Sequence, residues 1–307
     1  MKKYLGMFLI VCCAACQQNP VKPNIEEYVS STTDTAFIER QISHGRDIFY
    51  SIPTPVESVS LMKSAGAKYD QSLLSSNETV DNYVTNKSMA LNLGIYTTDM
   101  SFSSLFGDVQ TTVNFVNSSK KLAKELGIDI FDDETLKKLQ DNLNNKDVVI
   151  DIVSESFIKA NNELNSSERE YIASMVLMGG WIEGLYIATN IVDANKVTSK
   201  MAYHIYDQKN SLDVLIQMLK YNERKITGEK NNDLLELGPD LYRLSLAFNE
   251  IDMKLHMEAD PALRNNLLIT NGDSSYVTAI KTTTIVYGTA ENIIKIKNII
   301  NKIRTKI

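Results

Sequence analysis

Apolar residues recur every three or four positions along most of the chain, which is the period of an amphipathic α-helix. The clearest run begins at Phe102 and continues for about seven turns to Leu126, where Gly127 follows. Further helices are predicted over residues 55–65, 87–99, 132–143, 146–164, 196–206, 211–221, 239–258 and 290–303. The pattern therefore predicts an all-α fold in which about nine or ten helices form one bundle-like domain over residues 34–307.

Two helix starts carry a capping signature. Thr54-Pro55-Val56-Glu57 places a capping residue before a proline that needs no amide donor, and Glu57 can complete a capping box. Gly66 then suits the left-handed residue that ends such a helix. Ser167-Glu168-Arg169-Glu170 has the same form. It predicts that a second capped helix begins there.

The segment Tyr171–Val192 is the most apolar part of the body, and Glu183 is the single acid or base within it. Its length permits a membrane span, but a carboxylate and three glycines in its middle argue against one. We expect a buried central helix instead. The glycines allow another helix to approach closely, because they put hydrogen atoms where side chains would be. They are Gly179, Gly180 and Gly184.

Extended structure is indicated in one place only. Residues 267–287 contain Asn271-Gly272, a pair typical of tight turns, and a β-branched run from Thr282 to Val286. The all-α prediction therefore allows one small β-hairpin in this range.

The first residues have the order of a secretory signal peptide. A basic start, Met1-Lys2-Lys3, precedes an apolar run that is too short to span a bilayer, and small residues follow before Cys16. We assign residues 1–15 to this signal peptide. A zinc site is not indicated by the three cysteines at positions 12, 13 and 16, because no histidine or second cysteine pair follows nearby.

Ala14-Ala15-Cys16 after an apolar run resembles the lipobox of bacterial lipoproteins. The resemblance implies that Cys16 becomes the first residue of the mature chain and carries lipid on its sulfur and its amino group. Cys13 stands where that family usually carries leucine. The alternative is ordinary secretion, with cleavage near Ala15 and an unmodified Cys16.

The resemblance also implies where the mature protein lies. Residues 17–22 lack the acidic cluster that surface-exported lipoproteins of some bacterial phyla share, so we expect an outer-membrane lipoprotein that faces the periplasm. Residues 16–33 are polar, contain two prolines and show no helical period. Together with the lipidated cysteine, they are expected to form a flexible tether.

Three further segments resemble an uncharacterised family of helical lipoproteins of Bacteroidota. They are residues 50–55, 90–96 and 179–186. This likeness implies the same helical fold and the same envelope location, and it implies no activity.

Charge narrows the class of partner. The chain has 32 basic and 38 acidic residues, and removal of the two lysines in residues 1–15 leaves a mature net charge of about −8 by formal count. An acidic protein gains nothing from phosphate backbones, so nucleic acid is not expected as a partner. The mature chain keeps Cys16 alone, so it cannot form an internal disulfide.

Glu183 is the first candidate site residue. A carboxylate without a partner in an apolar surround has a raised pKa, which suits a general acid. The alternative is that Glu183 ties its helix to a neighbour through a tyrosine, a lysine or a backbone donor, because buried charges are normally paired.

The second candidate is a metal site. Asp252, His256 and Asp260 are spaced at steps of four, which would align them on one helix face, although the predicted helix over 239–258 ends before Asp260. A carboxylate-rich surface helix produces the same spacing by chance. The basic segment Lys295–Lys306 also has two interpretations: it contacts acidic lipid headgroups, or it is a solvated helix face over a core stripe.

No phosphate-binding glycine loop, H-E-x-x-H pattern or G-x-S-x-G elbow is present in the sequence, and we predict no cofactor. We expect a non-enzymatic binding or scaffolding module that is held at the membrane through lipid on Cys16. An envelope protein or a small ligand would be its partner. The alternative is a hydrolase or a metal-dependent enzyme that uses Glu183 or the His256 cluster.

Overall fold

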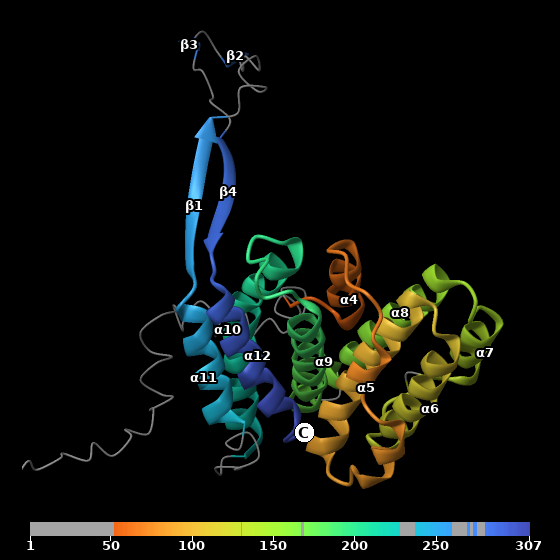
Figure 1. The fold of residues 1–307 in the computed structure, drawn as a ribbon. Coiled ribbons are helices and arrows are strands. Elements are labelled where there is room, and N and C mark those ends of the chain that lie inside the picture. The colour runs from red at the N-terminus through yellow and green to blue at the C-terminus, as the bar shows by residue number, and fades with distance from the viewer. Residues whose placement is uncertain are drawn as a thin grey trace, which may run out of the picture.

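The computed structural model describes residues 52–129, 131–166, 169–227, 237–259, 269–270, 273–274 and 280–307. Over these residues the chain forms nine α-helices, two short 3-10 helices and four strands (Figure 1). The all-α, multi-helix prediction for the body is confirmed. The signal peptide, Cys16 and the tether over 16–33 lie outside the described residues.

The helices follow one another through the body from α4 to α12. They are α4 (Pro55–Ser64), α5 (Asn86–Phe106), α6 (Val109–Glu125), α7 (Asp133–Asp141), α8 (Lys146–Ser166), α9 (Glu170–Ile191), α10 (Lys200–Thr227), α11 (Gly238–Asn249) and α12 (Ala290–Arg304). The 3-10 helices are η1 (Gln71–Leu73) and η2 (Asn77–Asn82). Both lie in the connection between α4 and α5.

The cap of α4 forms as predicted. The amide of Glu57 donates to Thr54 Oγ1 at 3.2 Å, and the amide of Thr54 donates to Glu57 Oε2 at 2.8 Å. Gly66 follows the helix with a positive φ of 89°, which an L side chain rarely adopts. Local signals therefore fix both ends of this helix.

The predicted capping box before α9 begins at Ser167, which lies outside the described residues. The helix begins at Glu170 after Arg169, which makes no side-chain capping hydrogen bond. The Arg169 side chain instead donates to the carbonyl oxygens of Leu126 and Gly127, which follow α6.

Two other helix boundaries differ from the prediction. The run from Phe102 to Leu126 is two helices, because Gly107 has a φ of 84° and Asp108 then accepts from the amide of Thr111 as a new N-cap. Conversely, the predicted helices over 196–206 and 211–221 form the single helix α10.

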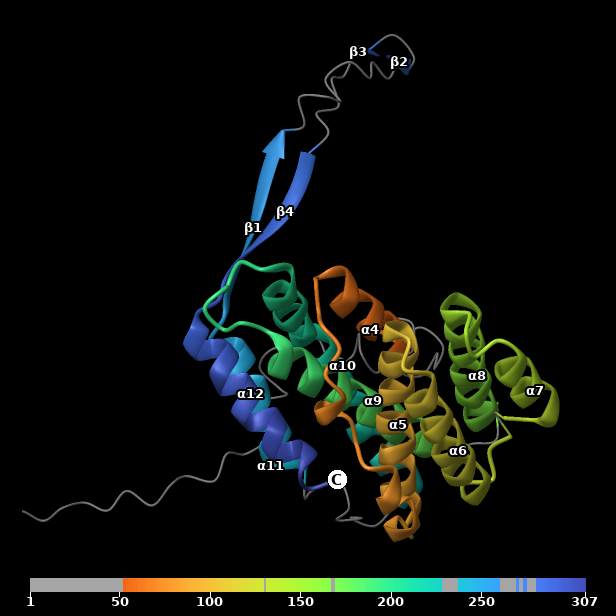
Figure 2. The same ribbon diagram turned by 45° about the vertical axis from the view of Figure 1, so that its right-hand side comes forward.

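Helix α9 lies in the middle of the body, with α5 on one side and α10 and α12 on the other (Figures 1 and 2). It is the one described helix that is long and apolar enough to cross a membrane, yet 94% of its apolar window is buried inside the body. That degree of burial belongs to a core helix. The prediction of a buried central helix is confirmed.

Glycines let α5 and α9 touch backbone to backbone. A Cβ at Gly94 would lie 1.9 Å from the carbonyl oxygen of Val176, and a Cβ at Gly179 would lie 1.9 Å from that of Leu91. Real Cβ atoms do not approach other atoms so closely, so no larger residue fits at either position without a backbone shift. The predicted close approach at Gly179 is therefore present.

The predicted helix over 239–258 is wrong in its second half. Helix α11 ends at Asn249, and strand β1 (Asp252–Ala259) follows. The strand pairs antiparallel with β4 (Ile280–Tyr287), from Asp252 opposite Tyr287 to Ala259 opposite Ile280. A smaller pair, β2 (Ile269–Thr270) and β3 (Asp273–Ser274), lies between them in sequence. The predicted hairpin exists, but its first long strand precedes the expected range.

The β1–β4 ribbon stands out from the helical body in both ribbon views (Figures 1 and 2). The chain re-enters the body at Gly288, just before α12. A Cβ there would lie 2.2 Å from the ring carbon Cζ of Tyr206, so the absence of a side chain lets the returning strand cross that ring.

Candidate functional site

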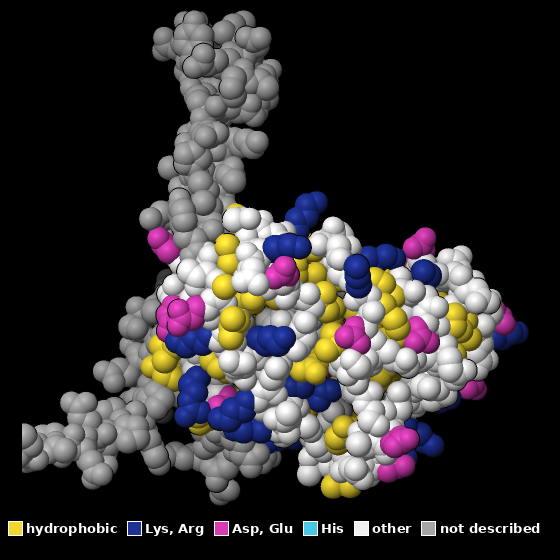
Figure 3. Space-filling model, in the orientation of Figure 1, with side chains coloured by type: hydrophobic (Ala, Val, Ile, Leu, Met, Phe, Trp, Pro, Cys, Tyr) yellow, Lys and Arg dark blue, Asp and Glu magenta, His cyan; other side chains and the backbone are white. Residues whose placement is uncertain are grey.

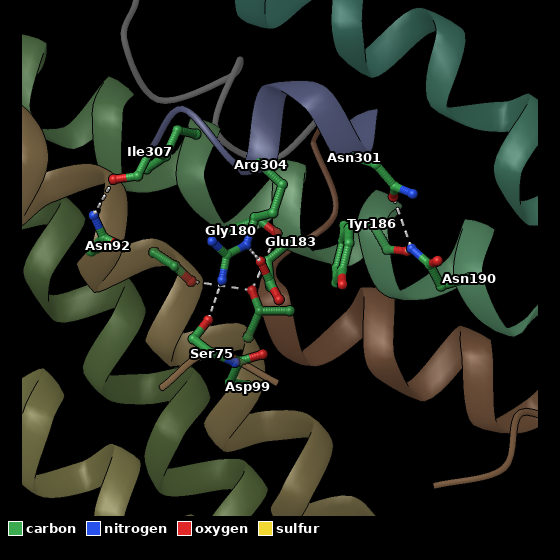
Figure 4. A network of polar contacts seen from close by, with 12 residues as sticks. Ser75, Asn92, Asp99, Gly180, Glu183, Tyr186, Asn190, Asn301, Arg304 and Ile307 are labelled. Atoms are coloured by element: carbon green, nitrogen blue, oxygen red, sulfur yellow. Dashed lines mark hydrogen bonds and ion pairs between the residues drawn. The ribbon is translucent and has the colours of Figure 1, made fainter. Parts of the chain in front are cut away.

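Glu183 lies at the centre of a buried charge cluster. Its side chain is on α9 and is 0% exposed. Arg304 on α12 donates its Nε hydrogen to Glu183 Oε2, and its Nη2 donates to Ser75 Oγ (Figure 4). The central helix is thus tied to the last helix and to the segment between η1 and η2.

A second carboxylate belongs to the same cluster. Asp99 on α5 is also 0% exposed, and its Oδ2 accepts from the backbone amide of Ser75 at 3.0 Å. Ser75 therefore contacts both Asp99 and Arg304. We call these four residues, Ser75, Asp99, Glu183 and Arg304, the Glu183 cluster.

The Glu183 cluster contains two carboxylates and one guanidinium. Oδ1 of Asp99 and Oε1 of Glu183 are buried, and no donor among the described residues forms a hydrogen bond with either oxygen. Ionised carboxylates only accept hydrogen bonds, and an unpaired charge in the interior is costly. One proton shared between the two carboxyl groups removes the excess negative charge and supplies the missing donor.

The electrostatics assign that proton mainly to Glu183. Burial raises the pKa of Glu183 well above its ordinary value, the charge of Asp99 raises it further, and Arg304 opposes both effects. A hydrogen bond between the two carboxyl groups also raises the pKa of Glu183. Burial also raises the pKa of Asp99, although its hydrogen bonds with Ser75 and the charge of Arg304 reduce this rise. The two carboxyl groups titrate as a pair, and the raised pKa favours the protonated form of Glu183.

Arg304 closes the Glu183 cluster on its outer side. Its side chain is 18% exposed, and its Cζ lies 5.9 Å from the centre of the Tyr186 ring, within the range of a cation–π contact. Burial raises the pKa of Tyr186, and the charge of Glu183 adds to this rise. Guanidinium and ring together separate the carboxyl groups from solvent.

The buried position of Glu183 suits a structural role in helix pairing better than a role in catalysis. A general acid must reach the atom to which it gives its proton, and Glu183 has no exposed surface. A surface hollow of about 470 Å³ lies elsewhere, between α6 and α7, and Glu183 does not line it. Its lining residues are Lys120, Ala123, Lys124, Gly127, Ile128, Asp129, Phe131, Asp132 and Asp133.

Sequence reasoning identified Glu183 but missed its partners. The expected tie to a neighbouring helix is present, through an arginine 121 positions later rather than a tyrosine, lysine or backbone donor. Asp99 is one polar residue in a helix that contains many, and nothing in its spacing relates it to Glu183. The one available signal was the need of a buried carboxylate for a cation.

Helix α12 carries further polar contacts to the core. Asn190 Nδ2 on α9 donates to Asn301 Oδ1 at 3.0 Å, and Asn92 Nδ2 on α5 donates to the carbonyl oxygen of Ile307 at 3.3 Å (Figure 4). The inward stripe is buried as predicted. It consists of Ile293, Ile296, Ile300 and Ile303.

A second cluster joins α12 to α11. Asp240 is 1% exposed, and its Oδ1 accepts from Arg243 Nη1 at 2.7 Å and from Lys302 Nζ at 3.1 Å. Lys306 Nζ donates to the other oxygen, Oδ2. Burial raises the pKa of Asp240, but hydrogen bonds from Lys306, Lys302 and Arg243 outweigh it and bring the pKa to about 2. Asp240 is therefore ionised throughout the physiological range.

The basic segment Lys295–Lys306 is accordingly more than a solvated face. Lys295 pairs with Glu250 at the end of α11, while Lys302 and Lys306 converge on Asp240. The sequence showed the positive charge of this segment, but not the buried carboxylate beneath it.

The metal candidate is not supported by the structure. Asp252 and His256 belong to strand β1, so the four-residue helical spacing that was to align them does not exist. Asp260 lies outside the described residues. Within the described part of the chain, no group of three or more His, Cys, Asp or Glu side chains is placed to hold a metal ion.

Comparison with known proteins adds no relative. The chain matches no protein-family model, no curated protein and no solved structure. The family resemblances stated above from residues remain predictions.

Proposed function

We propose that this chain is a lipid-anchored envelope protein whose helical body is a non-enzymatic binding or scaffolding module that faces the periplasm. The observation that carries the non-enzymatic part is the state of Glu183. The one acid of the central apolar segment is 0% exposed and is paired with Arg304. It holds helices together and has no access to a substrate.

The anchor is supported by the first sixteen residues. Cys16 follows a basic start, an apolar run and two alanines, which is the order that lipid-modified cysteines have. Each buried methylene of an attached acyl chain adds about 0.8 kcal/mol of membrane affinity, so several chains hold a protein durably. A polar tether over residues 16–33 would let the body stand away from the bilayer.

The β1–β4 ribbon supports a binding role. Among the described residues, β1 and β4 pair only with each other, so no described strand covers the second edge of either one. The ribbon also projects from the helical body (Figure 2). An isolated two-stranded ribbon is marginally stable in water, and open strand edges commonly accept a strand from a partner.

Metabolic labelling tests the anchor. Cells that express the chain are fed labelled palmitate, and the chain is compared with Cys16→Ala and with Cys13→Ala. We expect label in the unmodified chain and in Cys13→Ala, and none in Cys16→Ala. Equal labelling of both variants would refute lipid attachment at Cys16.

Site-specific photo-crosslinking tests the binding role. A photoreactive residue replaces His256 in strand β1 or, as a matched control, the exposed Lys137 in α7. A partner band that arises from position 256 and not from position 137 supports recognition through the ribbon. A purified chain that turns over a substrate, with no crosslinked partner from either position, would contradict the non-enzymatic module.

A further inference from the structure

Three cationic side chains converge on one buried carboxylate at the surface between α11 and α12. Arg243, Lys302 and Lys306 each donate a hydrogen bond to Asp240. Arg243 comes from α11, and the two lysines come from the C-terminal end of α12 or just after it. Figure 3 shows Lys and Arg side chains gathering over the lower part of these two helices.

The charges of this cluster do not balance. Asp240 is 1% exposed, whereas the side chains of Arg243, Lys302 and Lys306 are 53%, 55% and 41% exposed. Three positive charges against one negative charge leave an excess of two, and this excess is on the solvent side. The cations repel one another at such short separations, and a second anion would relieve that repulsion.

The other end of the same two helices shows a contrast. There Lys295 pairs with Glu250 one to one, so that contact is neutral. The three cations around Asp240 are therefore a local excess of positive charge in a chain with a net charge of −6.

The three cationic groups are held in place by Asp240 and still have unused N–H donors. An ammonium group has three N–H donors and a guanidinium has five, and each of these side chains uses one donor on Asp240. Because the buried carboxylate orients all three groups toward one point, less side-chain entropy is lost when a ligand binds. A tetrahedral oxyanion can accept several charge-assisted hydrogen bonds at once, so the remaining donors of three neighbouring cations suit it.

We propose that Arg243, Lys302 and Lys306 form a binding site for a phosphate-class oxyanion, from either free phosphate or the phosphate of a lipid headgroup. This site lies apart from the Glu183 cluster and does not depend on lipid attachment at Cys16. Asp240 is its positioning residue, because it orders the three cations and does not touch the ligand.

Titration calorimetry of the full chain with inorganic phosphate is the first test. Lys302→Gln removes one of the converging cations and leaves two on Asp240. Lys297→Gln is the matched control, because it makes the same charge change on the same helix outside the cluster. We expect saturable binding by the unmodified chain, a dissociation constant raised about tenfold or more in Lys302→Gln, and a change of less than about twofold in Lys297→Gln.

Vesicle flotation distinguishes the source of the phosphate. The chain carrying Cys16→Ala is mixed with phosphatidylcholine vesicles, with or without phosphatidic acid, so that lipid on Cys16 does not contribute. The site is assigned to a lipid headgroup if phosphatidic acid increases binding to the vesicles, and if Lys302→Gln loses this increase while Lys297→Gln keeps it. Saturable binding of inorganic phosphate without such extra binding assigns the site to a free ligand.

The proposal is overturned if neither inorganic phosphate nor phosphatidic acid binds. It is also overturned if the two glutamine variants lose binding equally, because general charge would then explain the attraction. Thermal unfolding checks that each variant is folded. If Lys302→Gln does not fold, Arg243→Gln takes its place with the same expected loss, since it removes a cation from α11.

Discussion

Arg304 of α12 donates a hydrogen bond to Glu183 of α9 within the body, although 121 positions separate them in sequence. Glu183 has no exposed surface, and 18% of the Arg304 side chain is exposed. The guanidinium thus covers the carboxyl group from outside and binds Ser75 at the same time. This one side chain links the last helix to the centre of the fold.

Glu183→Gln is expected to be tolerated at neutral pH. A glutamine amide can accept from Arg304 and donate toward Asp99, as the protonated carboxyl group does. We predict a change in the free energy of unfolding of less than about 1 kcal/mol, as for a well-matched replacement of a hydrogen-bonding group. Urea unfolding at pH 7 measures it. Glu183→Ala is the comparison, and it should cost more because it also leaves a cavity.

The pH dependence follows from the raised pKa of Glu183. A carboxyl group with a raised folded-state pKa stabilises the protein fully below its ordinary pKa of 4.5, and this stability is lost as the pH rises through the folded-state value. Asp240 has the opposite pH dependence. Its folded-state pKa of about 2 lies below the ordinary value of 3.8, so its contribution to folding stability is lost as the pH falls below 3.8.

The difference in the free energy of unfolding between the unmodified chain and Glu183→Gln isolates the effect of Glu183, because both proteins retain Asp240. From pH 4.5 upward, the unmodified chain should lose stability relative to the variant. Asp99, Arg304 and Tyr186 are the charged and titratable groups that face Glu183, and the pKa of Tyr186 is raised above its ordinary 10.0, outside this range. A difference that stays constant from pH 4.5 to 8 would show that Glu183 is ionised in the folded state.

Two glycines of α9 should respond oppositely to alanine. At Gly179 a methyl group would lie 1.9 Å from the carbonyl oxygen of Leu91, so Gly179→Ala must separate α5 from α9 and should cost about 3 kcal/mol or more. At Gly184 the nearest atom is Ser58 Cβ at 3.6 Å, an ordinary contact. Gly184→Ala should stabilise the helix by up to about 1 kcal/mol. Equal unfolding midpoints for the two variants would contradict the backbone contact.

Two buried tyrosines should respond differently to removal of the hydroxyl group. The Tyr206 hydroxyl is buried without a hydrogen-bond partner among the described residues, whereas the Tyr96 hydroxyl donates to the carbonyl oxygen of Ser76 at 2.9 Å. Tyr206→Phe should leave stability unchanged or raise it, and Tyr96→Phe should lower it by about 1 kcal/mol. Thermal and urea unfolding of both variants, side by side, checks the order. The reverse order would count against the described environments of the two rings.

Local signals predicted the parts of the fold that local chemistry determines. Thr54, Pro55 and Glu57 fix the start of α4, and the isoleucine stripe of α12 fixes its buried face. The break at Gly107-Asp108 was also readable, since a left-handed glycine and an aspartate cap stand side by side, but the continuous apolar stripe obscured it.

Strand β1 was missed because its residues fit two periods. Asp252 and His256 are four apart, as on a helix face, while Met253, Leu255 and Met257 alternate, as in a strand. Pairing with β4, more than twenty residues later, decides between them, and pairing is not a local property. The partners of Glu183 were missed for the same reason, because only the folded chain brings Asp99 and Arg304 to it.

A double-mutant cycle between Glu183 and Arg304 tests the structural role of the cluster most directly. Glu183→Met, Arg304→Met and the double variant are unfolded in urea at pH 7 beside the unmodified chain. We predict that the two single effects do not add, with a coupling energy of about 1–3 kcal/mol, because each residue compensates the buried charge or dipole of the other. Effects that add within about 0.5 kcal/mol would contradict the structural pairing of Glu183 with Arg304. Glu183 would then again be a candidate functional acid.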